Sequence, residues 1–188
     1  IVEYNIADTW KNGAGNNAFD GGCYYADIVD NGTIFRGNIA KNSYVAFQCG
    51  SGARSEWYAN QAINCEKFGM WNNATVAQAS DYRIVHNLGI IAAQGTFTHG
   101  DDTQVTPAAC VVTHTGTESN LVGVAMYNNA IVLPAGDTRV AANVLTTSHW
   151  AAGRAHVNRN VMICDDTKKL TCDVGVTDKT SAGGCLAV

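Results

Sequence analysis

The sequence predicts an all-β fold, specifically an antiparallel β-sandwich of jelly-roll type with at most one short helix. Proline occurs only twice whereas glycine occurs 19 times, so turns are expected to use residues that tolerate positive φ. Short segments rich in β-branched residues alternate polar and apolar side chains with the period of two expected of half-buried strands. Turn signals separate them at intervals near the ~8–12 residues typical of sandwiches and barrels.

Two segments are predicted to form antiparallel hairpins. Residues 25–36 contain two β-branched runs on either side of Asn31-Gly32, a dipeptide that suits the type I′ turn of a two-residue hairpin. Residues 121–133 contain two apolar runs separated by Asn128-Asn129. Each segment therefore predicts a strand, a turn and a second strand.

Further strands are predicted in the rest of the chain. In residues 137–145, the apolar residues Val140, Ala142 and Val144 alternate with other residues and would lie on the same side of a strand. This pattern predicts a strand with one buried and one solvated face. Residues 155–163 continue this pattern, but Arg159 interrupts the apolar face and indicates an edge strand. Three more segments are predicted as strands, namely residues 42–48, 83–93 and 110–115.

Two features leave alternatives to this arrangement. Apolar residues from Trp57 to Trp71 have partial i, i+3, i+4 spacing after a possible N-cap at Ser55, which allows one short helix ended by Gly69. Ile39, Ile63 and Ile84 each begin a segment of the form apolar, polar, small, apolar, at spacings of 24 and 21 residues. The rungs of a parallel β-helix recur at roughly this period, so that fold is the alternative architecture.

Length and composition predict a single folded domain over residues 1–188. Hydrophobic residues make up 46% of the chain, which argues against disorder. The net charge of -4 offers no basic face to a nucleic acid. The longest apolar runs, such as residues 90–93, are the length of strands and not of membrane spans.

Because the chain begins at Ile1, we expect a leader, a pro-segment or a longer precursor to have been removed, or the chain to have been trimmed.

Seven cysteines indicate a disulfide framework. They contain no CxxC pair, which argues against a zinc site. Three disulfides with one unpaired thiol would suit a secreted protein, and seven buried, reduced thiols are the alternative. The candidates for pairing are Cys23, Cys49, Cys65, Cys110, Cys164, Cys172 and Cys185.

Residues 122–144, which include the turn Leu133-Pro-Ala-Gly136 before an alternating strand, are followed by Gly153-Arg-Ala-His-Val-Asn158. This stretch, from residue 122 to about residue 160, resembles the strand-turn-strand core of C1q/TNF-like jelly rolls, the heads that cap collagen-like and phage fibres. The resemblance implies a trimeric jelly roll that serves assembly and recognition and not catalysis.

A few residues are candidates for chemistry or binding. His99, Asp101 and Asp102 form a polar cluster that could bind a divalent cation or exchange protons in glycoside chemistry, or could be a solvated turn. Aromatic side chains could form sugar-binding platforms or fill the core; these are Trp57, Tyr58, Trp71 and Trp150. Asn31 and Asn73 begin N-glycosylation sequons.

No motif of nucleotide binding, zinc proteolysis or serine hydrolysis occurs, so no cofactor or metal is expected. The preferred hypothesis is a non-enzymatic extracellular or virion-surface module. It would form a homo-oligomer, either a trimer or a filament, and bind a surface, either a glycan or a cell-surface receptor. The alternatives are a secreted carbohydrate-active enzyme and a structural filament or coat subunit.

Overall fold

The structure is a computed structural model of the 188-residue chain. It describes residues 1–9, 22–26, 31–49, 54–71, 80–93, 96, 109–112, 121–137, 140–143, 155–163, 170–171 and 186–187.

The described strands form three sheets, and every strand pair in them is parallel. Sheet A contains, in spatial order, β1 (Val2–Glu3), β4 (Asn31–Arg36), β7 (Arg54–Tyr58), β10 (Ser80–Val85), β13 (Leu121–Tyr127) and β16 (Ala155–Asn158). Sheet B contains β19 (Leu186–Ala187), β17 (Val161–Ile163), β14 (Ala130–Val132), β11 (Leu88–Ile91), β8 (Gln61–Cys65), β5 (Ile39–Lys41) and β2 (Ile6–Asp8). Sheet C contains β18 (Leu170–Thr171), β15 (Val140–Asn143), β12 (Ala109–Val112), β9 (Lys67–Trp71), β6 (Val45–Cys49) and β3 (Gly22–Ala26).

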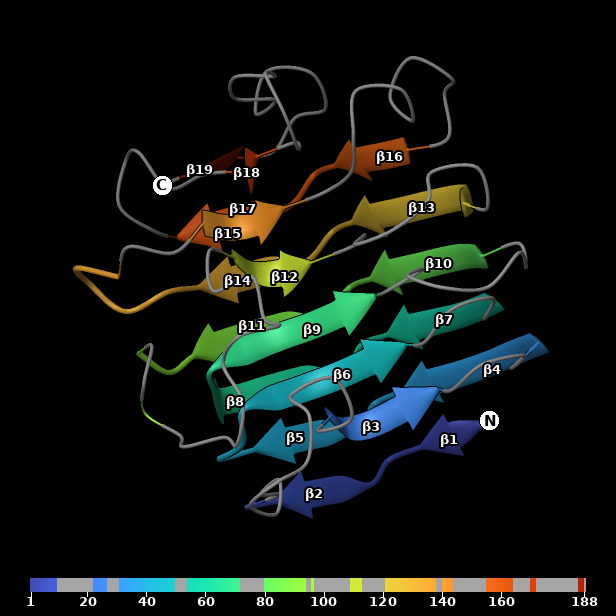
Figure 1. The fold of residues 1–188 in the computed structure, drawn as a ribbon, viewed down its shortest axis with the longest axis horizontal. Helices are drawn as coiled ribbons and strands as arrows, with labels where there is room; N and C mark the ends of the chain where they lie inside the picture. The colour runs from blue at the N-terminus through green and yellow to red at the C-terminus, as the bar shows by residue number, and fades with distance from the viewer. Residues whose placement is uncertain are drawn as a thin grey trace.

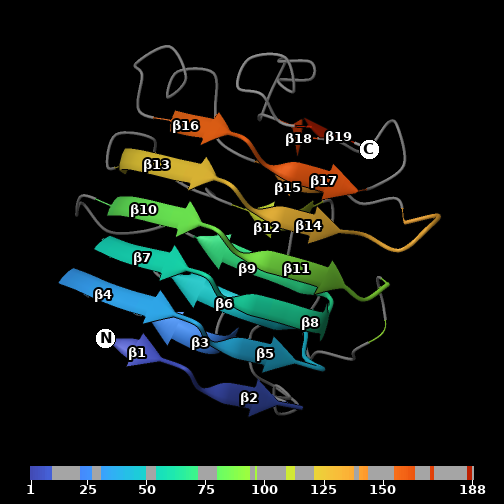
Figure 2. The same cartoon turned by 180° about the vertical axis from the view of Figure 1, so that it is seen from behind.

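From β1 to β18 the chain visits the sheets in a fixed rotation, because each strand of sheet A is followed by one of sheet B and then one of sheet C, and β19 then pairs with β17 in sheet B. Each round of three strands is one rung, and successive rungs stack from β1 upward (Figure 1). Seen from behind, sheets A and B rise as two neighbouring columns of strands (Figure 2). This arrangement is a parallel β-helix.

The prediction of all-β structure is confirmed for the described residues, but the predicted antiparallel sandwich is wrong because all pairings are parallel. The two predicted hairpins are not hairpins. β3 and β4, on either side of residues 27–30, belong to different sheets, and so do β13 and β14 around Asn128-Asn129. The jelly-roll fold implied for residues 122–160 is likewise not adopted, since β13 to β17 lie in parallel sheets. Asn31-Gly32 lies at the start of β4, where Gly32 has a φ of 90° and the register shifts, whereas Asn128-Asn129 lies at a corner between two sheets. A bulge, a corner and a hairpin turn all need left-handed residues, so the local signal does not distinguish them.

The predicted short helix after Ser55 is also wrong, since this region forms the strands β7, β8 and β9. Trp57, Ala62 and Phe68 are buried and point inward from three successive strands. The corner at Ala59 and the bend at Glu66 shift the period-two pattern between strands. The resulting spacing of apolar residues imitates that of a helix.

The corners between sheets A and B all have the same backbone form. The last residue before the turn has a positive φ, from 52° at Ala59 to 62° at Gly37, and the next residue is asparagine. At Gly37 a side chain would also collide with the ring of Tyr4, because a Cβ there would lie 2.6 Å from it. The six asparagines stack from rung to rung as an asparagine ladder, made of Asn5, Asn38, Asn60, Asn87, Asn129 and Asn160.

Hydrogen bonds along the ladder join each rung to the next. Asn87 shows the repeating pattern: its Oδ1 accepts from the backbone N–H of Asn60 at 2.8 Å, and its Nδ2 donates to the carbonyl of Trp57 at 2.8 Å. Its own backbone N–H donates to Oδ1 of Asn129 at 2.9 Å. Because buried backbone groups need partners, the ladder makes an otherwise costly corner stable.

The interior is filled by side chains that also stack from rung to rung. The rings of Phe35 and Trp57 are parallel, with centroids 4.0 Å apart, and Ile84 and Met126 continue the same column in register. On sheet B the inward positions of the lower rungs are small, such as Ala62 and Gly89. Within the described residues, no helix is long and apolar enough to cross a membrane.

Candidate binding face

The outer face of sheet A collects the charged and aromatic side chains of several rungs. On β7, Arg54, Glu56 and Tyr58 are exposed, whereas Ser55 and Trp57 point inward and are buried. This alternation follows from the period of two of a strand. Because neighbouring strands are parallel and in register, equivalent outward residues from different rungs lie side by side.

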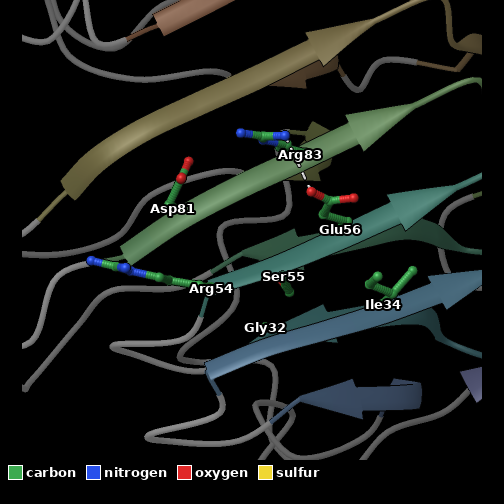
Figure 3. Close-up of a pocket in the computed structure, with 7 residues that line it drawn as sticks. All are labelled: Gly32, Ile34, Arg54, Ser55, Glu56, Asp81 and Arg83. Atoms are coloured by element: carbon green, nitrogen blue, oxygen red, sulfur yellow. Dashed lines mark hydrogen bonds and ion pairs between the residues drawn. The ribbon is translucent and has the colours of Figure 1, made fainter. Parts of the chain in front are cut away.

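A hollow of about 140 Å³ lies on this face, across β4, β7 and β10 (Figure 3). Parallel pairing places Glu56 between Ile34 and Arg83 and places Arg54 beside Asp81. The lining residues are Gly32, Ile34, Arg54, Ser55, Glu56, Asp81 and Arg83.

Charges of both signs are available in the hollow. Arg83 and Glu56 form an ion pair with Nη1 and Oε1 3.2 Å apart, and both side chains are about half exposed, so the pair adds little to stability. Figure 3 shows these two side chains joined, while Arg54 and Asp81 extend away from them. Within the described part of the chain, Arg54 and Asp81 form no ion pair. Their polar atoms can therefore accept or donate hydrogen bonds to a ligand.

Beside the hollow, three rings from successive rungs form an aromatic column: Tyr58, His86 and Tyr127. The centroids of Tyr58 and His86 are 5.4 Å apart, and those of His86 and Tyr127 are 6.5 Å apart, both in edge-to-face geometry. Tyr58 is 49% exposed. The column runs along the coil, two residues beyond Glu56 on the same face of β7.

The corner backbone fixes the position of this column. Tyr58 and Tyr127 end their strands, and His86 occupies the left-handed corner position with φ of 57°. The side-chain nitrogen Nδ2 of Asn128 lies 3.5 Å from Nε2 of His86. Each ring is thus within two residues of the asparagine ladder, which holds the corners in place.

The candidate aromatic residues fall in different places. Tyr58 lies on the binding face, but Trp57 is 0% exposed, and its Nε1 donates to Ser55 Oγ at 2.8 Å in the core. Trp57 therefore fills the interior and is not a sugar platform. Trp71 ends β9 and Asn31 begins β4. The other candidates lie outside the described residues: Asn73, His99, Asp101, Asp102 and Trp150.

The predicted disulfide framework is wrong for the three cysteines whose side chains are described, because Cys23, Cys49 and Cys65 form no disulfide. Cys23 donates to Ser43 Oγ at 3.0 Å, and burial raises the pKa of the Cys65 thiol to about 11. Cys49 and Cys65 pack inward as small apolar groups. Cys110 lies in β12, and the remaining three lie outside the described residues: Cys164, Cys172 and Cys185.

Sequence reasoning missed most of this face. The sequence signal for this face is the alternation of polar and apolar residues at 54–58 and 81–85. In the first segment, the spacing typical of a helix hides this alternation. The missed residues are Arg54, Glu56, Asp81, Arg83, His86 and Tyr127.

The chemistry of the face is that of hydrogen bonding and ring stacking. Among the described residues, no three histidine, cysteine or acidic side chains are grouped to hold a metal ion. The described residues together define a parallel β-helix with a polar and aromatic outer face on sheet A. Comparisons with protein-family models, curated proteins and solved structures found no match to this chain.

Proposed function

We propose that this chain is a non-enzymatic extracellular or virion-surface module that recognises glycans through the outer face of sheet A and self-associates. The single observation that supports recognition best is the aromatic column beside the charged hollow, in which Tyr58 and His86 are exposed and Tyr127 is partly exposed.

The aromatic column and the charged hollow match the two chemical features of a sugar, its apolar C–H face and its hydroxyl groups. The apolar C–H face of a sugar can pack on an exposed tyrosine ring, as apolar groups do on aromatic side chains. Sugar hydroxyls both donate and accept hydrogen bonds, and charged partners such as Arg54 and Asp81 strengthen those bonds. Rings on successive rungs, with centroids 5.4 Å and 6.5 Å apart, offer contacts to consecutive sugars of one chain.

The side chains of this face are held by a rigid scaffold. Strands β7, β10 and β13 pair along their lengths, and the asparagine ladder closes each corner. A preorganised face loses little conformational entropy when a ligand binds. This rigidity supports recognition of an extended ligand that lies along the coil.

The test is binding to an immobilised panel of polysaccharides by wild-type protein and by Tyr58→Ala. Loss of one stacking ring should weaken binding about two- to tenfold, since such contacts contribute about 0.5–1.5 kcal/mol. Tyr58→Phe keeps the ring and should restore most of the affinity. Tyr25→Ala, at a 37% exposed tyrosine on β3 of sheet C, is the matched control and should bind normally.

Two results would overturn the glycan proposal. One is the absence of binding to every member of the panel. The other is equal binding by wild-type protein and Tyr58→Ala. Release of new reducing ends from a bound polysaccharide would instead identify a carbohydrate-active enzyme and contradict the non-enzymatic assignment.

A further inference from the structure

The outer face of sheet B carries an unusually uniform set of side chains. Gly89 points inward between the outward residues Leu88 and Ile90, and Ile131 points inward between Ala130 and Val132. Parallel pairing repeats this arrangement on each rung. We name the resulting surface the aliphatic face, and its residues are Ile63, Leu88, Ile90, Val132, Val161 and Ile163.

The aliphatic face is open to solvent. Ile63, Ile90, Val132 and Ile163 follow one another in register across four strands, and Ile90 and Ile163 are 46% and 43% exposed. In Figure 2 these strands, β8, β11, β14 and β17, rise as one column. The other four residues of the face are partly exposed, so the six form one adjoining apolar surface that a partner can cover.

Charge is absent from the aliphatic face but present just below it. The equivalent outward positions on the two lower rungs are Asp8 and Lys41. From β8 to β17, the described outward residues of sheet B are apolar except Gln61 and the corner residue Asn64. Sheet A has the opposite character, with Arg54, Glu56 and other charged residues outside.

An uncharged, branched aliphatic surface is complementary to itself. Two copies of it meet without placing like charges together, as a symmetric contact between identical surfaces requires. Stacked sheets pack about 10 Å apart, with side chains of the facing sheets interdigitating. Membrane-surface binders carry Trp or an excess of Lys/Arg beside their apolar residues. The aliphatic face itself contains none of these residues, and Lys41, which lies beside Ile63, is in register with the opposite charge of Asp8.

The size of the face sets the expected strength of the contact. Four strands about 4.8 Å apart and three residues wide cover roughly 200 Å² in projection. A stable complex buries about 800 Å² on each partner. Contact through this face alone should therefore be reversible and depend on protein concentration.

We propose that the aliphatic face of sheet B is a homotypic contact, through which two copies of this chain associate face to face. The inference rests on the self-association part of the proposed function and names its surface. It does not depend on glycan binding by sheet A.

The test is sedimentation velocity over a series of concentrations with charges introduced at one position. Ile90→Glu and Ile90→Lys each place like charges in the contact, so each variant alone should associate at least tenfold more weakly than wild type. An equimolar mixture of the two should recover association, because opposite charges then face each other. Tyr25→Glu, on sheet C, should associate as wild type does.

The outcomes separate the possible errors. Wild-type protein that stays monomeric at every concentration would overturn the self-association part of the proposed function and this inference with it. Association that persists in both Ile90 variants would overturn only the assignment of the face. Recovery of association in the mixture supports a second copy as the occupant of the face. A lipid occupant would be identified if wild-type protein bound phosphatidylcholine vesicles, Ile90→Glu abolished that binding, and the mixture did not recover association. That result would overturn the homotypic contact.

Discussion

Polar atoms inside the coil are satisfied by their nearest neighbours. Ser55 Oγ accepts from Trp57 Nε1 and lies 3.3 Å from Cys49 Sγ. Cys65 Sγ donates to the carbonyl of Ala40 at 3.5 Å. Buried hydroxyl and thiol groups that have such partners avoid the cost of unpaired polar groups. They belong to the packing of the rungs and not to a reactive site.

The Cys65 thiol should make stability depend on alkaline pH. Burial raises its pKa from 9.0 to about 11 in the folded protein, so the folded state holds the proton more tightly than the unfolded state. The stabilisation is complete below pH 9 and is lost as pH rises toward 11. We expect the free energy of unfolding, measured by urea denaturation, to fall across this interval.

The variant Cys65→Ala isolates this effect. Its stability should fall less steeply between pH 9 and pH 11 than that of wild type, although Cys23, whose pKa burial also raises, keeps part of the slope. Equal slopes in wild type and variant would contradict the assignment to Cys65.

At the scale of elements, the repeating unit is a strand of sheet A, a left-handed residue, a ladder asparagine and a strand of sheet B. The ladder asparagines are separated by 33, 22, 27, 42 and 31 residues. The geometry repeats although the spacing does not. Repeated corners of constant form therefore join rungs of very different length.

Replacing a central ladder residue should destabilise the coil. In Asn87→Ala, the backbone N–H of Asn60 and the carbonyl of Trp57 both lose a buried partner, at about 1–3 kcal/mol for each such group. Urea denaturation should show a loss of about 2–6 kcal/mol. The matched control is Asn64→Gly, which removes an exposed side chain that donates one bond to Asn42 and leaves the φ of 54° at this position accessible; it should change stability by about 1 kcal/mol or less. Losses of similar size in the two variants would show that the ladder bonds do not carry this stability.

At the scale of the whole molecule, a parallel β-helix separates surfaces of different chemistry. Sheet A faces outward with charges and aromatic rings, and sheet B faces outward with aliphatic side chains. The interior between them is shared, because residues of all three sheets belong to one hydrophobic cluster. Because the outward side chains point away from this interior, changes on one outer face can leave the other face intact.

This separation predicts an effect on avidity. Ile90→Glu should bind a soluble, monovalent oligosaccharide as wild type does, because Ile90 lies on sheet B. On a dense glycan surface it should bind at least tenfold more weakly, since linked binding sites gain from multivalency. Surface plasmon resonance at high and low ligand density measures both. A loss of monovalent affinity would show that the two faces are not independent.

Several features could be predicted from particular residues. The alternation of Val140, Ala142 and Val144 predicted a strand, and β15 covers the first two of these residues. Asn128-Asn129 predicted a turn, and a corner lies there. The similar corner at Arg159-Asn160 was missed, because residues 155–163 were interpreted as one strand and are in fact β16 and β17. The candidate site was predicted only at Tyr58, since the residues around it come from separate rungs.

By itself, the sequence determined that the chain forms short strands joined at asparagine and glycine corners, because backbone preference and period-two burial are local properties. Only the tertiary structure decided that the strands run parallel, which sheet each one joins, and which outward side chains meet. These choices depend on pairing between residues such as Trp57 and Ile84, which lie on different rungs. Packing of the shared interior selects that pairing, and no local pattern specifies it.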